Sequence, residues 1–462
     1  MNLLSISWRN LRVRVLSTTL TTLSVALGAM LLCAIWLMIE AAERHFRGGQ
    51  LGFPAVVGPK QGSALEVVLN TVFNRGVSPG LVPFRVYQEL HDEKLDYRGG
   101  KLRMRYVIPQ ARGDNYKGYP IIGTTDEMFL KFRRASEGPL GFARGGPFVF
   151  SHEDLLAFVP KLIAHLAEAG QHAHEHKEGD PAHEHDAEGH MVVPPALRQA
   201  VLGAAVARRL GLDLGAKIVA THGLADDAGA HVHEESACAV VGILAATRTA
   251  IDEAIFIPLA TFLAISDHQQ LKEGQAADAG SLGLSAIIVN PADRLGPNYL
   301  RDAFQLRPEA QVAFTNFEVS NLLQLVGDAA QVLRVLSYFV LAVAGLAILV
   351  ALYNTMNERR REIAIMRSLG ARRGQILRIL LQESTLVSLV GAVLGIAACH
   401  LAAWVFAGPV ERLARVPVDP LQFSLAEFWL ILGTGLLGGF AGILPAIKGS
   451  MVQVADNLGP TS

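Results

Sequence analysis

Cysteine is scarce in this chain, which has three cysteines among 462 residues. Cys33 and Cys399 lie inside long apolar runs, and Cys238 is alone in the polar region 40–334. No disulfide can therefore form within that region, so its fold must depend on its own hydrophobic core. The same scarcity argues against a closed structural zinc site built on thiolates.

The chain also lacks the signatures of an enzyme. The phosphate-binding pattern G-x-x-x-x-G-K-[S/T] does not occur, and we find no nucleophile paired with a general base. A glycine-rich stretch at 58–63 departs from that pattern, so we interpret it as a structural turn. We predict no catalytic residues here, and we expect any ATPase activity on a partner chain.

Charge is sparse as well, at 18% of residues against 51% hydrophobic. Four runs lack Asp, Glu, Lys and Arg entirely, and each reaches the ~20 residues that cross a bilayer core. The alternative, four buried helices of a large soluble protein, fits such lengths poorly. The first run is too long for a signal peptide and has no cleavage site after it. These runs are residues 15–39, 335–357, 384–410 and 428–447.

The distribution of basic residues predicts which ends of the spans face the cytoplasm. The stretch before the first span and the loop between the second and third are rich in arginine, whereas the next connection is balanced in charge. Both termini are therefore predicted to be cytoplasmic. The predicted order is an inner-leaflet amphipathic helix (1–14), span one (15–39), an outer domain (40–334), span two (335–357), a cytoplasmic helix (358–378), span three (379–410), an outer connection (411–427), span four (428–447) and a cytoplasmic tail (448–462).

The fold class that follows is a four-span α-helical membrane domain with a large mixed α+β extracytoplasmic domain inserted between spans one and two. Short β-branched stretches in that domain predict strands, and longer amphipathic ones predict helices. The predicted strands are 55–57, 106–108, 121–122, 217–219, 239–243, 254–257 and 286–289, and the predicted helices are 85–93, 153–169 and 195–210.

The segment 358–373, extended to Arg378, carries seven arginines. Its apolar residues Ile363, Met366, Leu369 and Gly370 recur at helical spacing, which predicts a short amphipathic helix. Such a helix at a cytoplasmic surface suits anionic lipid or a groove on a soluble partner. The alternative is a topology signal without a partner.

The residues around this segment resemble those of the MacB–FtsX–LolC superfamily of ABC transporter permeases. Ala364 stands where glycine is common in that family, and the resemblance covers the membrane portions, about a third of the chain. The matching residues are Trp8-Arg9-Asn10-Leu11, Asn354, Met356, Glu358-Arg359, Arg361-Glu362-Ile363, Arg367, Leu369-Gly370-Ala371 and Leu444-Pro445-Ala446.

The resemblance implies a bacterial inner-membrane protein whose large domain is periplasmic. It implies that the basic segment docks on a separate cytoplasmic ATPase, which binds ATP and is expected in two copies. A second permease copy or a paralogue, membrane lipid and a periplasmic metal-binding or adaptor protein are further expected partners; nucleic acid is not. The implied coupling residues are Glu358, Arg359, Arg361, Glu362, Ile363, Arg367, Leu369 and Gly370.

Two features lie within the spans. Gly391 and Gly395, and Gly435 and Gly439, are spaced for close helix approach, either at a dimer seam or within one chain. His400 in span three is either a proton or substrate site or a hydrogen-bonded structural residue, and we favour the second.

A histidine-rich stretch occupies residues 171–190 and predicts a mobile polar loop. Imidazole and carboxylate together suit Zn²⁺, Ni²⁺ or Cu²⁺, and the irregular spacing favours weak, exchangeable binding. The alternative is a solvated insertion that binds metal incidentally. The candidate ligands are His172, His174, His176, His183, His185 and His190, with a thinner cluster at His222, His231 and His233.

Three functional hypotheses follow. The first is a permease subunit of a MacB/FtsX-type ABC complex that couples ATP hydrolysis to movement of its periplasmic domain, with a task in divalent metal (zinc) transport or homeostasis. The second is metal-independent efflux or lipoprotein release. The third is FtsX-like signalling to periplasmic partners without transport.

Overall fold

The computed structural model describes residues 15–49, 52–94, 96–97, 100–134, 138–172, 193–221, 237–265, 282–414 and 419–451. The chain divides into two compact units. A helical unit comprises residues 1–45 and 323–462, and a sheet domain comprises residues 46–322. The sheet domain is thus inserted between the first and second candidate spans, as the sequence predicts.

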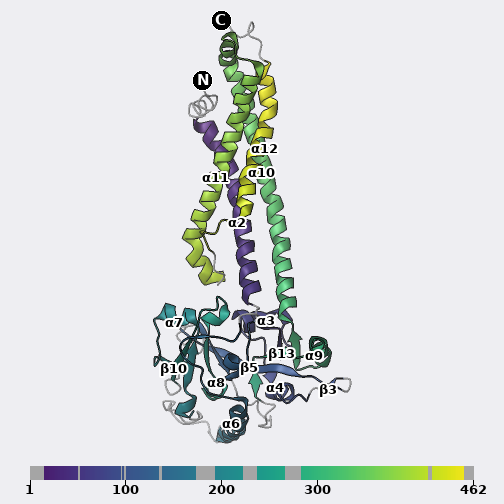
Figure 1. Cartoon of the computed structure of the whole chain (residues 1–462), viewed down its shortest axis with the longest axis vertical. Helices are drawn as coiled ribbons and strands as arrows, with labels where there is room; N and C mark the ends of the chain where they lie inside the picture. The colour runs from purple at the N-terminus through teal and green to yellow at the C-terminus, as the bar shows by residue number, and fades with distance from the viewer. Residues whose placement is uncertain are drawn as a thin grey trace, which may run out of the picture. The chain divides into compact units, whose positions relative to one another are not determined.

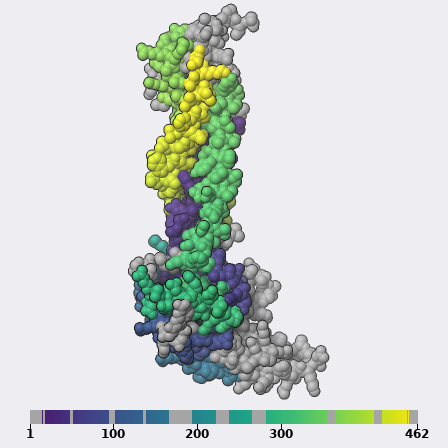
Figure 2. Space-filling view, turned by 90° about the vertical axis from the view of Figure 1, so that its right-hand side faces the viewer, coloured from purple at the N-terminus to yellow at the C-terminus, as the bar shows by residue number. Residues whose placement is uncertain are grey.

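The helical unit contains four long helices, α2 (Val15–Gly49), α10 (Thr315–Ser368), α11 (Arg373–Ala414) and α12 (Leu425–Ser450). They run side by side as one bundle (Figure 1), and α12 lies along α10 in the space-filling view (Figure 2). Each is long and apolar enough to cross a membrane, over Thr18–Arg47, Thr315–Asn354, Arg373–Pro409 and Leu425–Lys448. The second span is predicted over 335–357, and the helix that contains it begins earlier, at Thr315.

Small residues set the packing of this bundle. A side chain at Gly391 would collide with Val25 of α2, and one at Gly395 would collide with the Ala26 carbonyl of the same helix. The core of the bundle draws on all four helices. Its buried members are Ala29, Leu32, Cys33, Leu341, Ala392, Ile396, Cys399 and Leu430.

The sheet domain mixes short helices with one large sheet. The helices are α3 (Ala64–Phe73), α4 (Phe84–His91), α5 (Glu127–Leu130), α6 (His152–His172), α7 (Ala204–Leu210), α8 (Leu259–Ile265) and α9 (Gly296–Gln305), with 3₁₀ turns η2 (Pro195–Leu197) and η4 (Ala250–Glu253). The strands are β1 (Ala55–Pro59), β2 (Val82–Pro83), β3 (Asp96–Tyr97), β4 (Gly100–Lys101), β5 (Met104–Tyr116), β6 (Tyr119–Thr124), β7 (Phe142–Gly145), β8 (Gln199–Leu202), β9 (Lys217–Ile218), β10 (Cys238–Leu244), β11 (Ile255–Pro258), β12 (Gly283–Leu284), β13 (Ala286–Pro291) and β14 (Ala310–Ala313).

The main sheet has the order β14-β1-β13-β5-β6-β11-β8-β10-β7, with β9 added on β10. Most neighbours are antiparallel, but β6 pairs with β11 and β8 with β10 in parallel. In the central register Ile288 of β13 faces Val56 of β1 and Ile108 of β5. Directly paired residues share one face of a sheet, and all three side chains are fully buried, so this face of the sheet is covered.

Each of the seven strands predicted from sequence overlaps a strand of the structure. The helix predicted over 195–210 is wrong in its first half, because β8 runs through it between β10 and β11. Gly203 separates this strand from α7. A side chain there would collide with the backbone of Asp252, so only glycine fits at this position between β8 and α7.

The glycine-rich stretch 58–63 is the predicted turn. It joins β1 to α3, and the carbonyls of Pro59 and Gly62 accept hydrogen bonds from the side chain of Gln311 at 2.8 and 2.6 Å. Ser63 then begins α3 with a capping box to Glu66.

Arg112 of β5 holds the other end of α3. Arg112 is half-buried, and its guanidinium donates to the carbonyls of Asn70 and Thr71 at 2.7 and 2.6 Å, and to Asn74 Oδ1 at 2.6 Å. Burial lowers the pKa of Arg112 to about 9, so the group remains a cation at neutral pH. It therefore complements the negative C-terminal end of the helix with a full charge.

Candidate functional site

The basic segment does not form the separate helix predicted over 358–378. Its first part is the last three turns of α10, which ends at Ser368, and α11 begins at Arg373. Gly370, with φ +97°, ends α10. Its N–H donates to the Arg367 carbonyl and the Ala371 N–H donates to the Met366 carbonyl, both at 3.0 Å. This pair of bonds is a Schellman motif, in which glycine is the usual residue at the positive φ.

The N-terminus of α11 is capped by a side chain of its own first turn. The N–H of Arg372 donates to Oε1 of Gln375 at 2.8 Å, so the side chain in the first turn of α11 satisfies a backbone donor that the helix itself leaves open. The hydroxyl of Ser368 donates to the Ile365 carbonyl at 2.8 Å. The four-residue connection 369–372 is therefore held by backbone and side-chain hydrogen bonds on both sides.

The apolar stripe predicted for partner docking is divided in two. Ile363 is 2% exposed and packs with Ile376, Leu380 and Ala446, and Met366 packs partly against the same group. Ile363, predicted as a coupling contact, is thus buried within its own chain and unavailable to a partner. Leu369 is instead 82% exposed.

Positive charge surrounds Leu369. Arg372, Arg373 and Arg378 are exposed, and no Asp or Glu occurs between residues 363 and 382. We call the set Leu369, Gly370, Arg372, Arg373 and Arg378 the α10–α11 turn surface. An exposed leucine on a hydrogen-bonded turn, with exposed arginines close to it in the sequence, suits a protein surface that offers an apolar pocket with carboxylates around it.

The remaining coupling candidates fall partly beyond the described side chains. Glu358, Arg359, Arg361 and Glu362 belong to α10, but their side chains lie outside the described part of the structure. Arg367 is half-buried.

The span glycines lie against helices of the same chain. Gly391 and Gly395 face α2, and Gly435 and Gly439 face Leu389 and Thr385 of α11. Their spacing is therefore accounted for by packing within the chain.

His400 makes the hydrogen bond expected of a structural histidine. Its Nδ1 lies 2.8 Å from the Pro420 carbonyl, and its ring lies against Phe423 with centroids 4.6 Å apart.

Of the six candidate histidine ligands in the histidine-rich stretch, His172 alone belongs to the described residues, as the last residue of α6. His174, His176, His183, His185 and His190 lie outside the described residues, as do His222, His231 and His233.

The sheet domain holds a histidine pair that the sequence does not predict. The rings of His91 and His152 stack with centroids 3.4 Å apart, and the Tyr87 hydroxyl lies 2.7 Å from Nδ1 of His152. Burial and the neighbouring His91 lower the pKa of His152 to about 4. Asp92 completes a group with metal-ligand chemistry, but its carboxylate is paired with Lys94 at 2.7 Å. The two histidines are far apart in sequence, so only the fold brings them together.

Comparison with known proteins identifies the membrane portion. Residues 334–451 match the FtsX-like permease C-terminal family. The chain is 29% identical over 169 residues to the uncharacterized ABC transporter permease YknZ of Bacillus subtilis, covering 34% of this chain and 40% of that protein.

Two further relatives are named as ATP-binding/permease proteins. The macrolide export ATP-binding/permease protein MacB of Chromobacterium violaceum is 29% identical over 149 residues, or 31% of this chain and 22% of that protein. The pyoverdine export ATP-binding/permease protein PvdT of Pseudomonas aeruginosa is 34% identical over 146 residues, which are 30% of this chain and 21% of that protein. The chain thus matches less than half the length of each of these relatives.

Four apolar helices and the match to this domain support a multi-pass membrane protein. Residues 334–451 therefore form an FtsX-like permease domain, and the relatives named MacB and ABC transporter permease support the resemblance to the MacB/FtsX-like superfamily seen in the sequence.

Proposed function

We propose that this chain is the permease subunit of an ABC complex, and that a separate cytoplasmic ATPase docks on the α10–α11 turn surface. The observation that carries the proposal is the exposed Leu369, held among arginines on a hydrogen-bonded turn between two candidate spans. Anchoring of Ile363 inside the bundle supports it, because a force applied to the turn then acts on α10 and α11 together.

The proposed transmission runs along α10. This helix has 54 residues and leads without a break from the residue after Phe314 to Ser368, a length of about 80 Å. β14, at the edge of the main sheet, precedes it by one residue. Movement of the turn is therefore passed along a continuous helix to the sheet domain, which carries out the mechanical task.

The proposed topology places the turn in the cytoplasm of a bacterial cell and the sheet domain in the periplasm, with both termini cytoplasmic. The three cysteines are buried, so introduced cysteines can be labelled over a low background. Val77→Cys, at a position 84% exposed in the sheet domain, is expected to react with an impermeant maleimide in intact spheroplasts. Arg372→Cys is expected to react only after lysis. The reverse pattern would reject the topology.

Charge reversal tests the docking. The double variant Arg372→Glu/Arg373→Glu is expected to lose its associated P-loop ATPase on purification from its own membrane, because the favourable field becomes repulsive. Its matched control is Arg208→Glu/Arg209→Glu in α7 of the sheet domain, which is expected to retain the ATPase. Equal retention by both double variants would contradict docking at the turn.

The task of the complex stays a hypothesis. A role in divalent metal transport or homeostasis, zinc first, rests on the composition of residues 171–190 alone. Metal-independent efflux or lipoprotein release and FtsX-like signalling are its alternatives. Zinc-dependent growth of a deletion strain would favour the first, accumulated unreleased lipoproteins the second, and altered peptidoglycan cleavage the third.

A further inference from the structure

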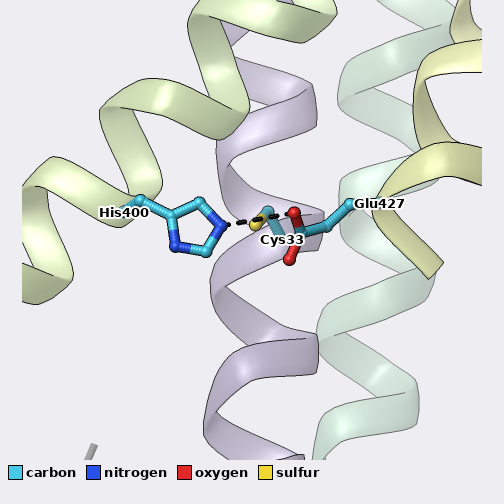
Figure 3. Close-up of side chains that lie close together, drawn as sticks. All are labelled: Cys33, His400 and Glu427. Atoms are coloured by element: carbon cyan, nitrogen blue, oxygen red, sulfur yellow. Dashed lines mark ion pairs between the residues drawn. The ribbon is translucent and has the colours of Figure 1, made fainter. Parts of the chain in front are cut away.

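Three side chains with metal-ligand chemistry meet inside the helical unit. Cys33 comes from α2, His400 from α11 and Glu427 from the first turn of α12, and they point toward one another (Figure 3). One ligand atom from each lies within 4.8 Å of the others. Cys33 is 2% exposed and Glu427 8% exposed, so the group is enclosed by the bundle.

Hydrogen bonds from neighbouring residues fix how these groups face the centre. The Pro420 carbonyl can only accept, so Nδ1 of His400, 2.8 Å away, must carry the proton of that bond. The Nε2 of a neutral His400 is then a lone-pair donor. Oε1 of Glu427 accepts the Ser424 N–H at 3.2 Å, which turns Oε2 toward the histidine. Such fixing of both ligands by outer partners is typical of metal sites.

The central contact is incomplete without a cation. Nε2 of His400 lies 3.3 Å from Oε2 of Glu427, yet it is buried and has no hydrogen-bond partner. With His400 neutral, Nε2 and Oε2 are two electron-pair donors that face each other, and a bound cation can bridge them. Nitrogen and oxygen ligands at about 2.0–2.1 Å from a tetrahedral zinc ion are about 3.3–3.4 Å apart. The observed separation therefore matches one edge of a zinc tetrahedron.

We propose that Cys33, His400 and Glu427 form a binding site for one divalent transition-metal ion of the zinc type. The Cys33 thiol gives up its proton when the ion binds. Thiolate, carboxylate and neutral imidazole then balance the two positive charges, which a site enclosed among apolar helices requires. The fourth position is left to water or an exogenous ligand, as in open zinc sites.

Binding at this site would tie three helices together beside the α11–α12 connection. The site is separate from the histidine-rich stretch and does not rest on the proposed docking of an ATPase. Sulfur, nitrogen and oxygen donors together favour Zn²⁺ or Co²⁺ over Mg²⁺ and Ca²⁺.

Cobalt substitution tests the site in the full-length protein. The purified, reduced permease in detergent is titrated with Co²⁺, and the thiolate-to-cobalt charge-transfer absorption is recorded. Imidazole and carboxylate ligands of the histidine-rich stretch give no such band, so the band reports on a cysteine ligand. One equivalent of bound cobalt with this band is expected, and Zn²⁺ is expected to displace it.

Variants assign the ligands. Cys33→Ser is expected to abolish the band, and Glu427→Gln to weaken cobalt binding at least tenfold while keeping the acceptor for Ser424. Cys399→Ser is the matched control, since that thiol is buried and interacts with Cys33 but lies outside the ligand group; it should leave the band intact, as should Cys238→Ser. Monodisperse elution of each variant confirms that it is folded. A wild-type protein without the band, or a band that persists in Cys33→Ser, would overturn the proposal and leave a His400–Glu427 ion pair.

Discussion

Gly370 offers a sharp test of how the α10–α11 turn is built. Its φ of +97° disfavours any residue with a Cβ, yet a Cβ there would meet no atom within 4 Å. The cost of Gly370→Ala is therefore purely conformational, at about 1–2 kcal/mol. Gly374 provides a matched control, since it also faces open space but lies in the first turn of α11.

The two alanine variants should shift stability in opposite directions. Gly374→Ala removes backbone freedom from the unfolded chain at a helical position and should stabilise by about 0.4–1 kcal/mol. At about 2–4 °C per kcal/mol, Gly370→Ala should lower the thermal midpoint by roughly 2–8 °C. A thiol-reactive dye can follow unfolding in detergent, because the three native cysteines are buried. Equal midpoints for the two variants would refute the Schellman motif as the stop signal of α10.

Three further predictions concern the sheet domain. Arg112→Met should destabilise it by roughly 3–5 kcal/mol, since the carbonyls of Asn70 and Thr71 at the end of α3 lose their donor; urea unfolding followed by the reaction of the buried Cys238 thiol of β10 with a thiol reagent measures this. The pKa of His152 is about 4 in the folded state, so below pH 6.5 the unfolded state binds a proton that the folded state does not bind. The free energy of unfolding should therefore fall as the pH falls from 6.5 to 4. His152→Gln should make the thermal midpoint less dependent on pH over this range. In the Cys33→Ser variant, deletion of residues 173–190 should keep the fold but remove reversible Zn²⁺ binding that weakens below about pH 6 in calorimetry; zinc binding that is unchanged by the deletion would show that the loop is not the site.

The sequence predicts the spans and strands well for a physical reason. Bilayer crossing demands long uncharged runs, and buried strands demand β-branched stretches such as 286–289, so both leave a local signal. It predicts the 195–210 segment poorly because β8 is short and its strand character comes from pairing with β10 and β11.

The packing of the basic segment also depends on residues that are distant in the sequence, which limits its prediction. Helical periodicity at Ile363, Met366 and Leu369 is real, but periodicity alone cannot tell which apolar residue packs inward. Only the close approach of α11 and α12 buries Ile363 and leaves Leu369 exposed. The Leu369-Gly370 pair, by contrast, carries the helix stop in its own sequence, because glycine is the usual residue at that position.

The candidate metal group could not be predicted from sequence. Cys33, His400 and Glu427 are widely separated along the chain and come from three helices. Glu427 lies in the first turn of α12, and nothing local in the sequence predicts that His400 faces its carboxylate.

Site-specific photo-crosslinking tests the central claim most directly. A benzophenone amino acid replaces Leu369 in the permease, which is expressed in its own membrane, and adducts are identified by mass spectrometry. The control position is Val343, which is 63% exposed on α10 within the candidate span. Docking at the turn surface predicts an adduct with a P-loop ATPase from position 369 and none from position 343. An ATPase adduct absent at 369, although the ATPase copurifies with the permease, would contradict the account.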